Sequence, residues 1–168
     1  EGVKQYIIRL RQGEQNLLWP TEIKWFAKSS GTTSDKSKFI PVSEESLYEN
    51  HFKGGIDIYS IYARNYPETK MFNGKCLSVG GSHQINTFSA NSRYGDISAI
   101  IVQNMPWWAE TRRAPRKEVT LMAEWNAKVE KMALDTMNEN ITSFTGVPSW
   151  TLLILKKVLE LSGKKNIK

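Results

Sequence analysis

The sequence predicts an α/β fold, and three observations support this prediction. Segments whose apolar residues recur at every third or fourth position, a spacing typical of amphipathic helices, alternate with short apolar segments typical of buried strands. Apolar residues make up 40% of the 168 residues, which is enough for a packed core. No internal repeat or low-complexity linker divides the sequence. We therefore expect one globular domain or a part of one.

In the first half of the chain the pattern predicts three helical segments and one strand. Residues 3–10 have helical spacing, whereas 23–26 form a short apolar strand that runs into a polar loop. Ser43 is suited to cap the next helix, because acidic residues follow it in the first turn. We expect this helix to reach Gly54-Gly55 and a second helical stretch to cover 56–62.

From residue 75 onward the predicted elements are again short strands and helices. The pattern predicts strands at 75–79 and 141–144, an amphipathic helix at 119–137, and a helix that Pro148 begins and Gly163 ends. Residues 94–103 are apolar enough for either a buried strand or a helix, and their pattern does not decide between the two.

The net charge of +6 is concentrated in two places. Arg112, Arg113, Arg116 and Lys117 carry four positive charges, and the segment 156–168 carries five lysines against one glutamate. A surface that follows nucleic-acid phosphates usually spreads its charge along one face. We therefore interpret both clusters as solvated surface charge and expect no nucleic-acid partner. The alternative for the arginine cluster is recognition of a carboxylate.

The only cysteine is Cys76, so no disulfide can form within the chain, and a reducing, cytoplasmic location is expected. The apolar residues around Cys76 predict a buried strand rather than a reactive thiol. The longest apolar run, 152–155, is far shorter than the roughly 20 residues that cross a bilayer. We therefore expect no membrane partner.

The segment from Ser29 to Lys38 is the sharpest chemical signal. It contains no apolar side chain and combines hydroxyl groups, a glycine without a Cβ atom, and lysines, which together are the groups that hold polyphosphate. It is not a Walker A loop, because Asp35 rather than glycine precedes Lys36. Gly31 also lacks the partner glycines of a dinucleotide fingerprint. From these residues alone, a phosphate-binding loop and an ordinary polar surface loop both remain open.

The segment FAKSSGTTSDKSKFIPVS resembles the first motif of the auxin-responsive promoter family, the acyl acid–amido synthetases, in its bacterial branch. This family is part of the adenylate-forming superfamily of acyl-activating enzymes. Four other stretches agree, so the resemblance covers essentially the whole chain: LWPTEIKWF, GGSHQINTFS, Trp107-Trp108 and SFTGVPSWTLLILKK. The resemblance implies part of a large N-terminal adenylating domain, with helices packed on a mixed sheet. We expect residues 1–168 to be a single, incomplete fragment of it, without the mobile C-terminal domain.

The resemblance also implies a chemistry and a set of phosphate contacts. A carboxylic acid would react with ATP to give an acyl-adenylate, and an amine or amino acid would then take the acyl group, with Mg²⁺ on the phosphates. The residues implied to contact the ATP phosphates are Ser29, Ser30, Gly31, Thr32 and Thr33, with Lys38 preferred over Lys36 as the cation. The Pro-Lys pair of the general superfamily is missing here. A non-catalytic interaction domain with the same architecture is the alternative.

Candidates for an acyl-substrate pocket are Val147, Trp150 and His83. The first two lie where the resemblance places a helix beside the acyl pocket, but the same pattern would also suit a buried helix in which Trp150 only packs. His83 follows Gly80-Gly81, and glycines let a loop approach a ligand closely. We expect His51 to be exposed on its helix, Trp107 and Trp108 to be core residues, and no catalytic nucleophile. The two histidines lack acidic partners at metal-binding spacing, so no metal site is predicted.

The sequence contains no match to the family's second motif, which ends in Ser-Glu, or to its later Gly-Asp motif. We therefore expect the isolated fragment to be inactive. The identities of the acid and the amine, and the oligomeric state, do not follow from the sequence.

Overall fold

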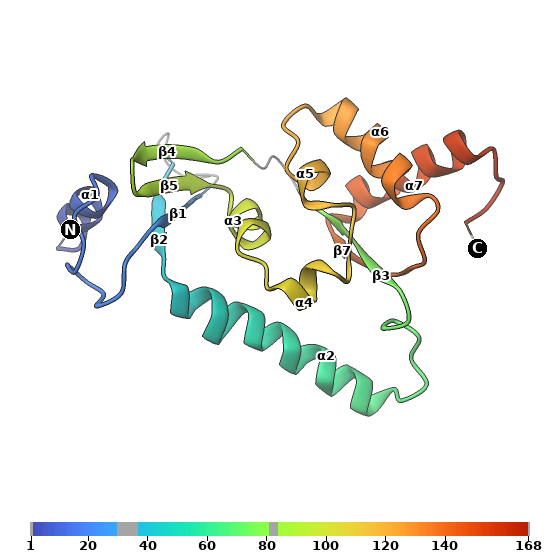
Figure 1. Ribbon diagram of the computed structural model, residues 1–168, viewed down its shortest axis with the longest axis horizontal. Coiled ribbons are helices and arrows are strands. Elements are labelled where there is room, and N and C mark those ends of the chain that lie inside the picture. Colours follow the sequence, from blue (N-terminus) through green and yellow to red (C-terminus); the bar gives the residue numbers. More distant parts are fainter. Residues whose placement is uncertain (1, 30–36, 81–83, 168) are drawn as a thin grey trace. The chain divides into compact units, whose positions relative to one another are not determined.

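The computed structural model describes residues 2–29, 37–80 and 84–167, and the chain divides into two compact units (Figure 1). Unit 1 consists of Glu1–Pro67 and Ile85–Asn104, and unit 2 consists of Glu68–Gln84 and Met105–Lys168. Each unit has its own sheet and its own buried apolar cluster or clusters. The mixture of helices and short strands confirms the predicted α/β class.

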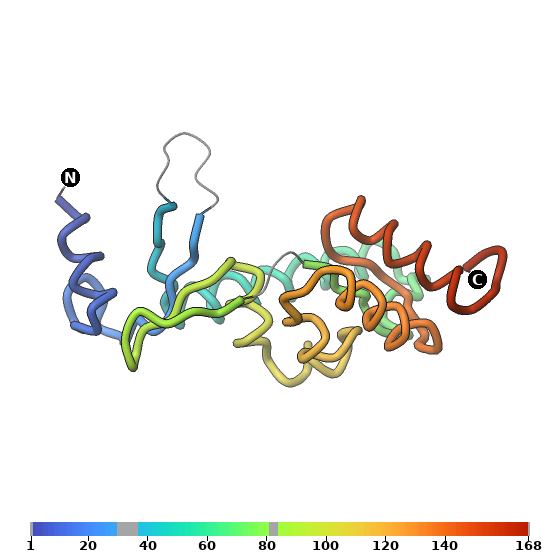
Figure 2. The backbone as a smooth tube through the Cα atoms, turned by 90° about the horizontal axis from the view of Figure 1, so that it is seen from above, coloured from blue at the N-terminus to red at the C-terminus, as the bar shows by residue number. Residues whose placement is uncertain are grey.

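Unit 1 is built on a mixed four-stranded sheet in the order β2-β1-β5-β4. Strand β1 pairs antiparallel with β2 and parallel with β5, and β5 pairs antiparallel with β4. Figure 2 shows β1 and β2 running side by side. The elements of unit 1 are α1 (Lys4–Arg11), β1 (Trp25–Lys28), β2 (Phe39–Val42), the π-helix η1 (Ser46–Phe52), α2 (Lys53–Asn65), β4 (Asn86–Ser89), β5 (Ser92–Gly95) and α3 (Ile97–Gln103).

The two faces of this sheet bury different clusters, because successive side chains of a strand point to opposite faces. Phe26 of β1 is fully buried and packs with Leu10 and Ile23, and the neighbouring Ala27 belongs to the cluster on the other face. On the Phe26 side, the Phe88 and Tyr94 rings stack at 4.2 Å between centroids, and the Arg11 guanidinium lies 4.2 Å from the Phe88 centroid. This aromatic contact ties α1 to the sheet.

Unit 2 has a three-stranded sheet in the order β6-β3-β7, in which β3 pairs parallel with both neighbours. Leu77 and Val79 of β3 are buried against Met132 of α6 and Ile154 of α7. The elements of unit 2 are β3 (Lys75–Val79), α4 (Trp107–Glu110), β6 (Arg113–Ala114), α5 (Lys117–Thr120), α6 (Trp125–Thr136), β7 (Ile141–Gly146) and α7 (Pro148–Ser162).

Several predicted elements are confirmed. The expected strands at 75–79 and 141–144 are β3 and β7, and Pro148 and Gly163 bound α7, with Gly163 in the left-handed conformation at φ 66°. Residues 94–103, predicted as either a strand or a helix, contain parts of both: β5 ends at Gly95, and α3 begins after Asp96. The strand at Cys76 is also confirmed, although the thiol is only half-buried and lies 3.2 Å from Thr145 Oγ1.

Two helix predictions are wrong in their boundaries. Gly54-Gly55 does not divide the helix, because η1 continues directly into α2; glycine lowers helix stability by about 1 kcal/mol without forcing a break. The helix expected at 119–137 is interrupted over 121–124. There the Glu124 side chain accepts hydrogen bonds from the N–H groups of Asn126 and Ala127, so it caps a new helix.

Two expectations about burial are also wrong. Arg113 is not surface charge: its side chain is buried, forms an ion pair with Glu110 at 2.7 Å and donates to the Pro115 carbonyl at 2.9 Å. Burial of a guanidinium requires such partners. Trp107 is not a core residue, since it is 79% exposed on the short helix α4. Among the described residues, no helix combines the length and the apolar character needed to cross a membrane.

The lack of space beside Gly146 of β7 gives the first prediction. A Cβ atom at Gly146 would lie 2.0 Å from the Val79 carbonyl oxygen, and Gly146 has φ +145°. We expect Gly146→Ala to lower the free energy of unfolding, measured in urea, by about 2 kcal/mol or more, because strain and overpacking add. The matched control is Gly54→Ala in a helix with open space at the Cβ position, which should raise stability by roughly 0.5–1 kcal/mol. Equal effects of the two substitutions would contradict the β3–β7 register.

A buried lysine of α6 gives the second prediction. Lys128 Nζ lies 3.4 Å from the Gly80 carbonyl oxygen, and burial lowers the pKa of Lys128 to about 8. The unfolded state therefore binds more protons than the folded state between about pH 8 and 10.5. The free-energy cost of burying this lysine falls as the pH rises through that window, so the free energy of unfolding rises.

We expect the difference in unfolding free energy between the wild type and Lys128→Met to shift in favour of the wild type by about 2–3 kcal/mol between about pH 7.5 and 10. The same comparison with Lys131→Met, an exposed lysine of the same helix, should be independent of pH. A flat profile for Lys128→Met would show that the lysine is solvated in the folded state.

Candidate functional site

The β1–β2 hairpin holds the two ends of the predicted phosphate loop. The last paired residues are Lys28 and Phe39, and Ser29 and Lys38 follow directly. Ser29 N donates to the Lys38 carbonyl oxygen at 2.9 Å, and Lys38 N donates to Ser29 Oγ at 3.1 Å. Both ends of the loop are therefore held opposite each other by one backbone–backbone hydrogen bond and one hydrogen bond to the Ser29 side chain.

The described ends of the loop keep groups that can reach a ligand. Ser29 Oγ accepts one hydrogen bond from Lys38 N, which leaves the hydroxyl proton to donate. Lys38 is exposed, and among the ion pairs between described residues none involves its ammonium group. The predicted contact residues Ser30, Gly31, Thr32 and Thr33, and the second lysine Lys36, lie outside the described residues.

A pocket of about 510 Å³ lies beside the base of this loop. It is bounded by the ends of β1 and β2 and by residues of η1 and α3, and most of its walls are apolar. The lining residues are Ala27, Lys28, Ser29, Ile40, Pro41, Val42, Ser46, Leu47, His51, Ile97 and Ile101. Ser29 therefore belongs both to the loop and to the pocket wall.

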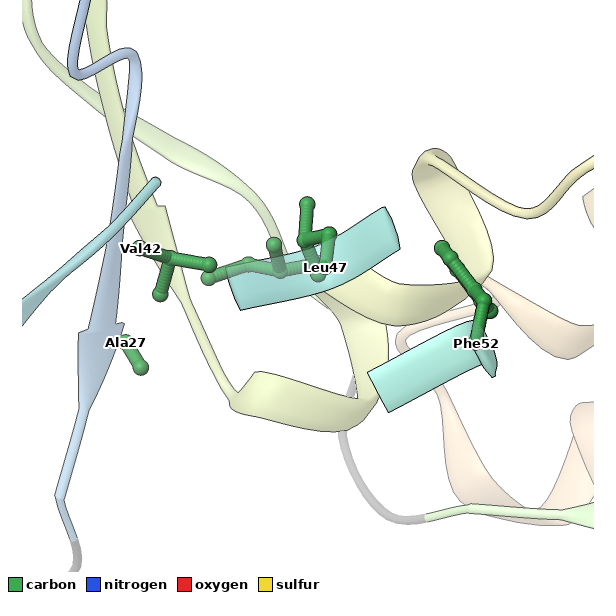
Figure 3. Close-up of a cluster of buried hydrophobic side chains, with 5 residues drawn as sticks. Ala27, Val42, Leu47 and Phe52 are labelled. Atoms are coloured by element: carbon green, nitrogen blue, oxygen red, sulfur yellow. The ribbon is translucent and has the colours of Figure 1, made fainter. Parts of the chain in front are cut away.

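The pocket walls are held by one buried cluster. Figure 3 shows side chains of this cluster extending from the hairpin to η1: Ala27 of β1, Val42 of β2, and Leu47 and Phe52 of η1. Ile100 of α3 also belongs to the cluster. All five are at most 9% exposed. Ala27, Val42 and Leu47 themselves line the pocket, and Phe52 and Ile100 each adjoin a lining residue, so packing of the cluster sets the positions of the pocket walls.

Residues of η1 form one wall of the pocket. Ser43 Oγ accepts a hydrogen bond from Ser46 N at 3.1 Å, which confirms Ser43 as the cap of the helical segment. Leu47 and His51, four residues apart on one face, both line the pocket. His51 is exposed, as expected, and its ring lies edge-on to Phe52 at 5.3 Å. Its place at the pocket was missed, since the pocket forms only when η1 packs with β1, β2 and α3.

The candidates for the acyl pocket belong to unit 2. Val147 precedes Pro148 at the start of α7 and is 41% exposed, whereas Trp150 is half-buried. The Trp150 ring lies 5.3 Å from that of Trp125 and packs on the cluster around Met132. These contacts give Trp150 a packing role, and the substrate role of both residues stays a prediction. His83 lies outside the described residues.

The three arginines of the basic cluster in unit 2 are engaged in internal contacts. Arg112 donates to the Phe72 carbonyl oxygen at 2.7 Å, and Arg116 pairs with Asp135 at 3.2 Å. Together with the burial of Arg113, these contacts disfavour the arginine cluster as a carboxylate site. Within 2–29, 37–80 and 84–167, no three His, Cys, Asp or Glu side chains group closely enough to hold a metal ion.

Solved structures of other proteins share this fold. Two similar solved structures are a GH3.15 acyl acid amido synthetase, with a TM-score of 0.66, and AtGH3.15 acyl acid amido synthetase in complex with 2,4-DB, with a TM-score of 0.67. Each is 20% identical to this chain, and each match covers 95% of this chain and 28% of the other. At that identity the likeness shows a shared fold, and the chain spans 28% of the length of these synthetases.

No curated protein matches the chain. The sequence profile of the GH3 family N-terminal domain, however, matches residues 1–167, which is nearly the whole length. The chain therefore belongs to the GH3 family.

Proposed function

We propose that the protein containing this chain is an ATP-dependent acyl acid–amido synthetase. The observation that carries the proposal is the family match over residues 1–167, together with a loop of phosphate-binding composition whose ends are clamped by Ser29 and Lys38. In the first step, a carboxylate oxygen attacks the α-phosphorus of ATP, which forms the acyl-adenylate and releases pyrophosphate. In the second step, an amine or amino acid attacks the acyl carbon, loses a proton and displaces AMP.

The chain would contribute positioning and electrostatic stabilisation rather than a nucleophile. Backbone N–H groups and hydroxyls of Ser29 to Thr33 would donate to phosphate oxygens, and the Lys38 ammonium would offset their charge. Holding the phosphates at a fixed place also lowers the entropic cost of reaching the reactive geometry. These groups would accelerate the reaction to the extent that they bind the charge distribution of the transition state more tightly than that of the ground state.

Mg²⁺ is the second expected cofactor. It usually binds nucleotides through phosphate oxygens and water, with only one or two protein carboxylates, so the absence of a carboxylate cluster among the described residues is compatible with it. When bound, it would neutralise charge on the phosphates. No residue described here is assigned as its ligand.

The apolar pocket beside Ser29 supports a small carboxylic acid as substrate. A volume of about 510 Å³ is in the range of small-molecule sites, and its apolar walls suit the body of an organic acid whose carboxylate points to the loop. The complex of AtGH3.15 with 2,4-DB supports the same substrate class. Val147, Trp150 and His83 remain the other candidates for acyl contacts.

The competing proposal is a non-catalytic interaction domain with this architecture. The hydroxyl-rich sequence from Ser29 to Thr33 favours the enzyme, because hydroxyl groups and a glycine together suit the binding of phosphate oxygens. A cytoplasmic location remains a proposal that rests on the single cysteine, and membership of the bacterial branch remains a prediction from the resemblance.

Removal of the proposed phosphate contacts gives the third prediction. In the full-length protein, the double variant Lys38→Ala, Thr32→Ala should weaken ATP binding about tenfold or more in a calorimetric titration, since hydrogen bonds to charged groups contribute about 1.5–3 kcal/mol each. Lys24→Ala, an exposed lysine of the same unit that pairs with Glu22, should leave the affinity unchanged. Equal ATP affinity of the double variant and the wild type would remove the phosphate-loop assignment.

The fourth prediction concerns the extent of chain that the reaction needs. The full-length protein should exchange radiolabelled pyrophosphate into ATP when it is given a suitable carboxylic acid. The 168-residue chain alone should not, because it spans only 28% of the related synthetases and lacks the family's later nucleotide motifs. Robust exchange by the short chain would refute this view.

A further inference from the structure

Arg11 of unit 1 carries a positive charge that no acidic side chain balances. It is the last residue of α1, which lies beside the hairpin of β1 and β2 (Figure 2). In the ranges that the structure describes, no ion pair involves Arg11, whereas Arg9 of the same helix pairs with Glu14. Arg11 Nε is buried, and no described group accepts a hydrogen bond from it. A half-buried guanidinium with an unsatisfied donor costs free energy, so its position needs a physical reason.

Two aromatic rings hold this guanidinium in place. Its central carbon lies 4.2 Å from the Phe88 centroid and 4.5 Å from the Phe39 centroid, and the two rings meet edge to face at 4.9 Å. The backbone is anchored as well, because Ser92 Oγ donates to the Arg11 carbonyl oxygen at 2.8 Å. Contact with a ring face attracts the cation but supplies no acceptor for the N–H groups in its plane. The guanidinium is therefore pre-organised, and its buried Nε still needs an acceptor.

Arg11 lies next to the base of the proposed phosphate loop. Phe39, over which its guanidinium lies, directly follows Lys38 in the sequence. Lys38 in turn is joined to Ser29 by the two hydrogen bonds that close the loop. The charge of Arg11 is thus one aromatic ring away from the place where the chain leaves and re-enters the sheet.

Arg11 and the pocket proposed for the acid lie on opposite faces of the hairpin. Phe39 packs with Phe26, whereas Ala27 lines the pocket, and successive residues of a strand point to opposite faces. In the proposed first step, the carboxylate attacks the α-phosphorus in line with the leaving pyrophosphate, so these two groups lie on opposite sides of that atom. An acid bound in the pocket therefore directs the terminal phosphates toward the face that carries Arg11.

We propose that Arg11 binds the two terminal phosphates of ATP and the pyrophosphate that they become. This inference rests on the proposed function and extends it, since it assigns the leaving group to a residue outside the loop from Ser29 to Lys38. A guanidinium presents a planar fork of N–H donors that matches phosphate oxygens, and its charge is permanent. It would stabilise the negative charge that grows on the pyrophosphate as its bond to the α-phosphorus breaks. The phosphates supply the acceptor that the guanidinium lacks.

Nucleotide affinities of the full-length protein test this assignment. We expect Arg11→Met, which keeps an apolar side chain on the two rings, to weaken ATP binding about tenfold or more in a calorimetric titration. The affinity for AMP should not change, because AMP lacks both terminal phosphates. Arg11→Lys should lose less ATP affinity than Arg11→Met, since it keeps the charge without the fork. The matched control Arg9→Met removes an arginine of the same helix and should change neither affinity.

The possible results separate this inference from the proposed function. If the wild type binds ATP and Arg11→Met binds it equally well, the inference is wrong and the loop assignment stands. An equal loss of ATP and AMP affinity would show that Arg11 only packs on the aromatic rings. A wild type that binds neither nucleotide would contradict the proposed function, and this inference with it.

Labelling of the wild-type protein makes the test independent of whether the variants fold. Phenylglyoxal modifies arginine side chains, and tandem mass spectrometry follows Arg11 and Arg9 separately. ATP or pyrophosphate at ten times its dissociation constant should slow the modification of Arg11 about tenfold, because only the unliganded protein reacts. AMP should not slow it, and the rate at Arg9 should stay constant throughout. Equal rates at Arg11 with and without ATP, or equal protection by AMP, would overturn the proposal.

Discussion

The antiparallel pairing of β1 with β2 is the constraint on which the candidate site depends. It holds Ser29 opposite Lys38 through two hydrogen bonds, so the residues between them must leave and re-enter the sheet at one place. The same two strands supply Ala27 and Val42 to the buried cluster with η1 and α3. Packing on one face of the sheet thus fixes both the base of the loop and the walls of the adjacent pocket. The other face is covered by the cluster of Leu10, Ile23 and Phe26, against which Phe39 of β2 also packs.

Under the proposed function, the loop would act without a nucleophile. Acyl-adenylate formation needs the carboxylate, the α-phosphorus and the leaving pyrophosphate in one line, and the chain would supply geometry and positive charge. The base of the hairpin is held by the pairing of Lys28 with Phe39 and by the hydrogen bonds between Ser29 and Lys38. An apolar pocket next to it can hold the organic part of the acid in a place from which the carboxylate reaches the phosphates.

The sequence predicted the secondary structure where one local signal dominates. Pro148 and Gly163 bound α7 because one pre-sets φ and the other adopts the left-handed conformation that ends a helix. Predictions failed where a side chain found a partner that spacing does not reveal. Glu124 caps α6 inside an apparently continuous apolar pattern, and Arg113 is buried because Glu110 and the Pro115 carbonyl satisfy it. His51 was placed correctly as exposed, but its position at the pocket depends on the packing of η1 with β1, β2 and α3, which local spacing does not reveal.

The composition of Ser29 to Lys38 indicates phosphate binding, which stays a prediction, whereas the pocket beside the loop depends on tertiary packing of four separate elements. The central claim is that this loop binds the phosphates of ATP. Hydrogen–deuterium exchange of the full-length protein, followed in the peptide that spans residues 29–38, tests it most directly. The account predicts slower exchange with ATP or with pyrophosphate and no change with adenosine. Unchanged exchange with ATP, or equal protection by adenosine, would contradict it.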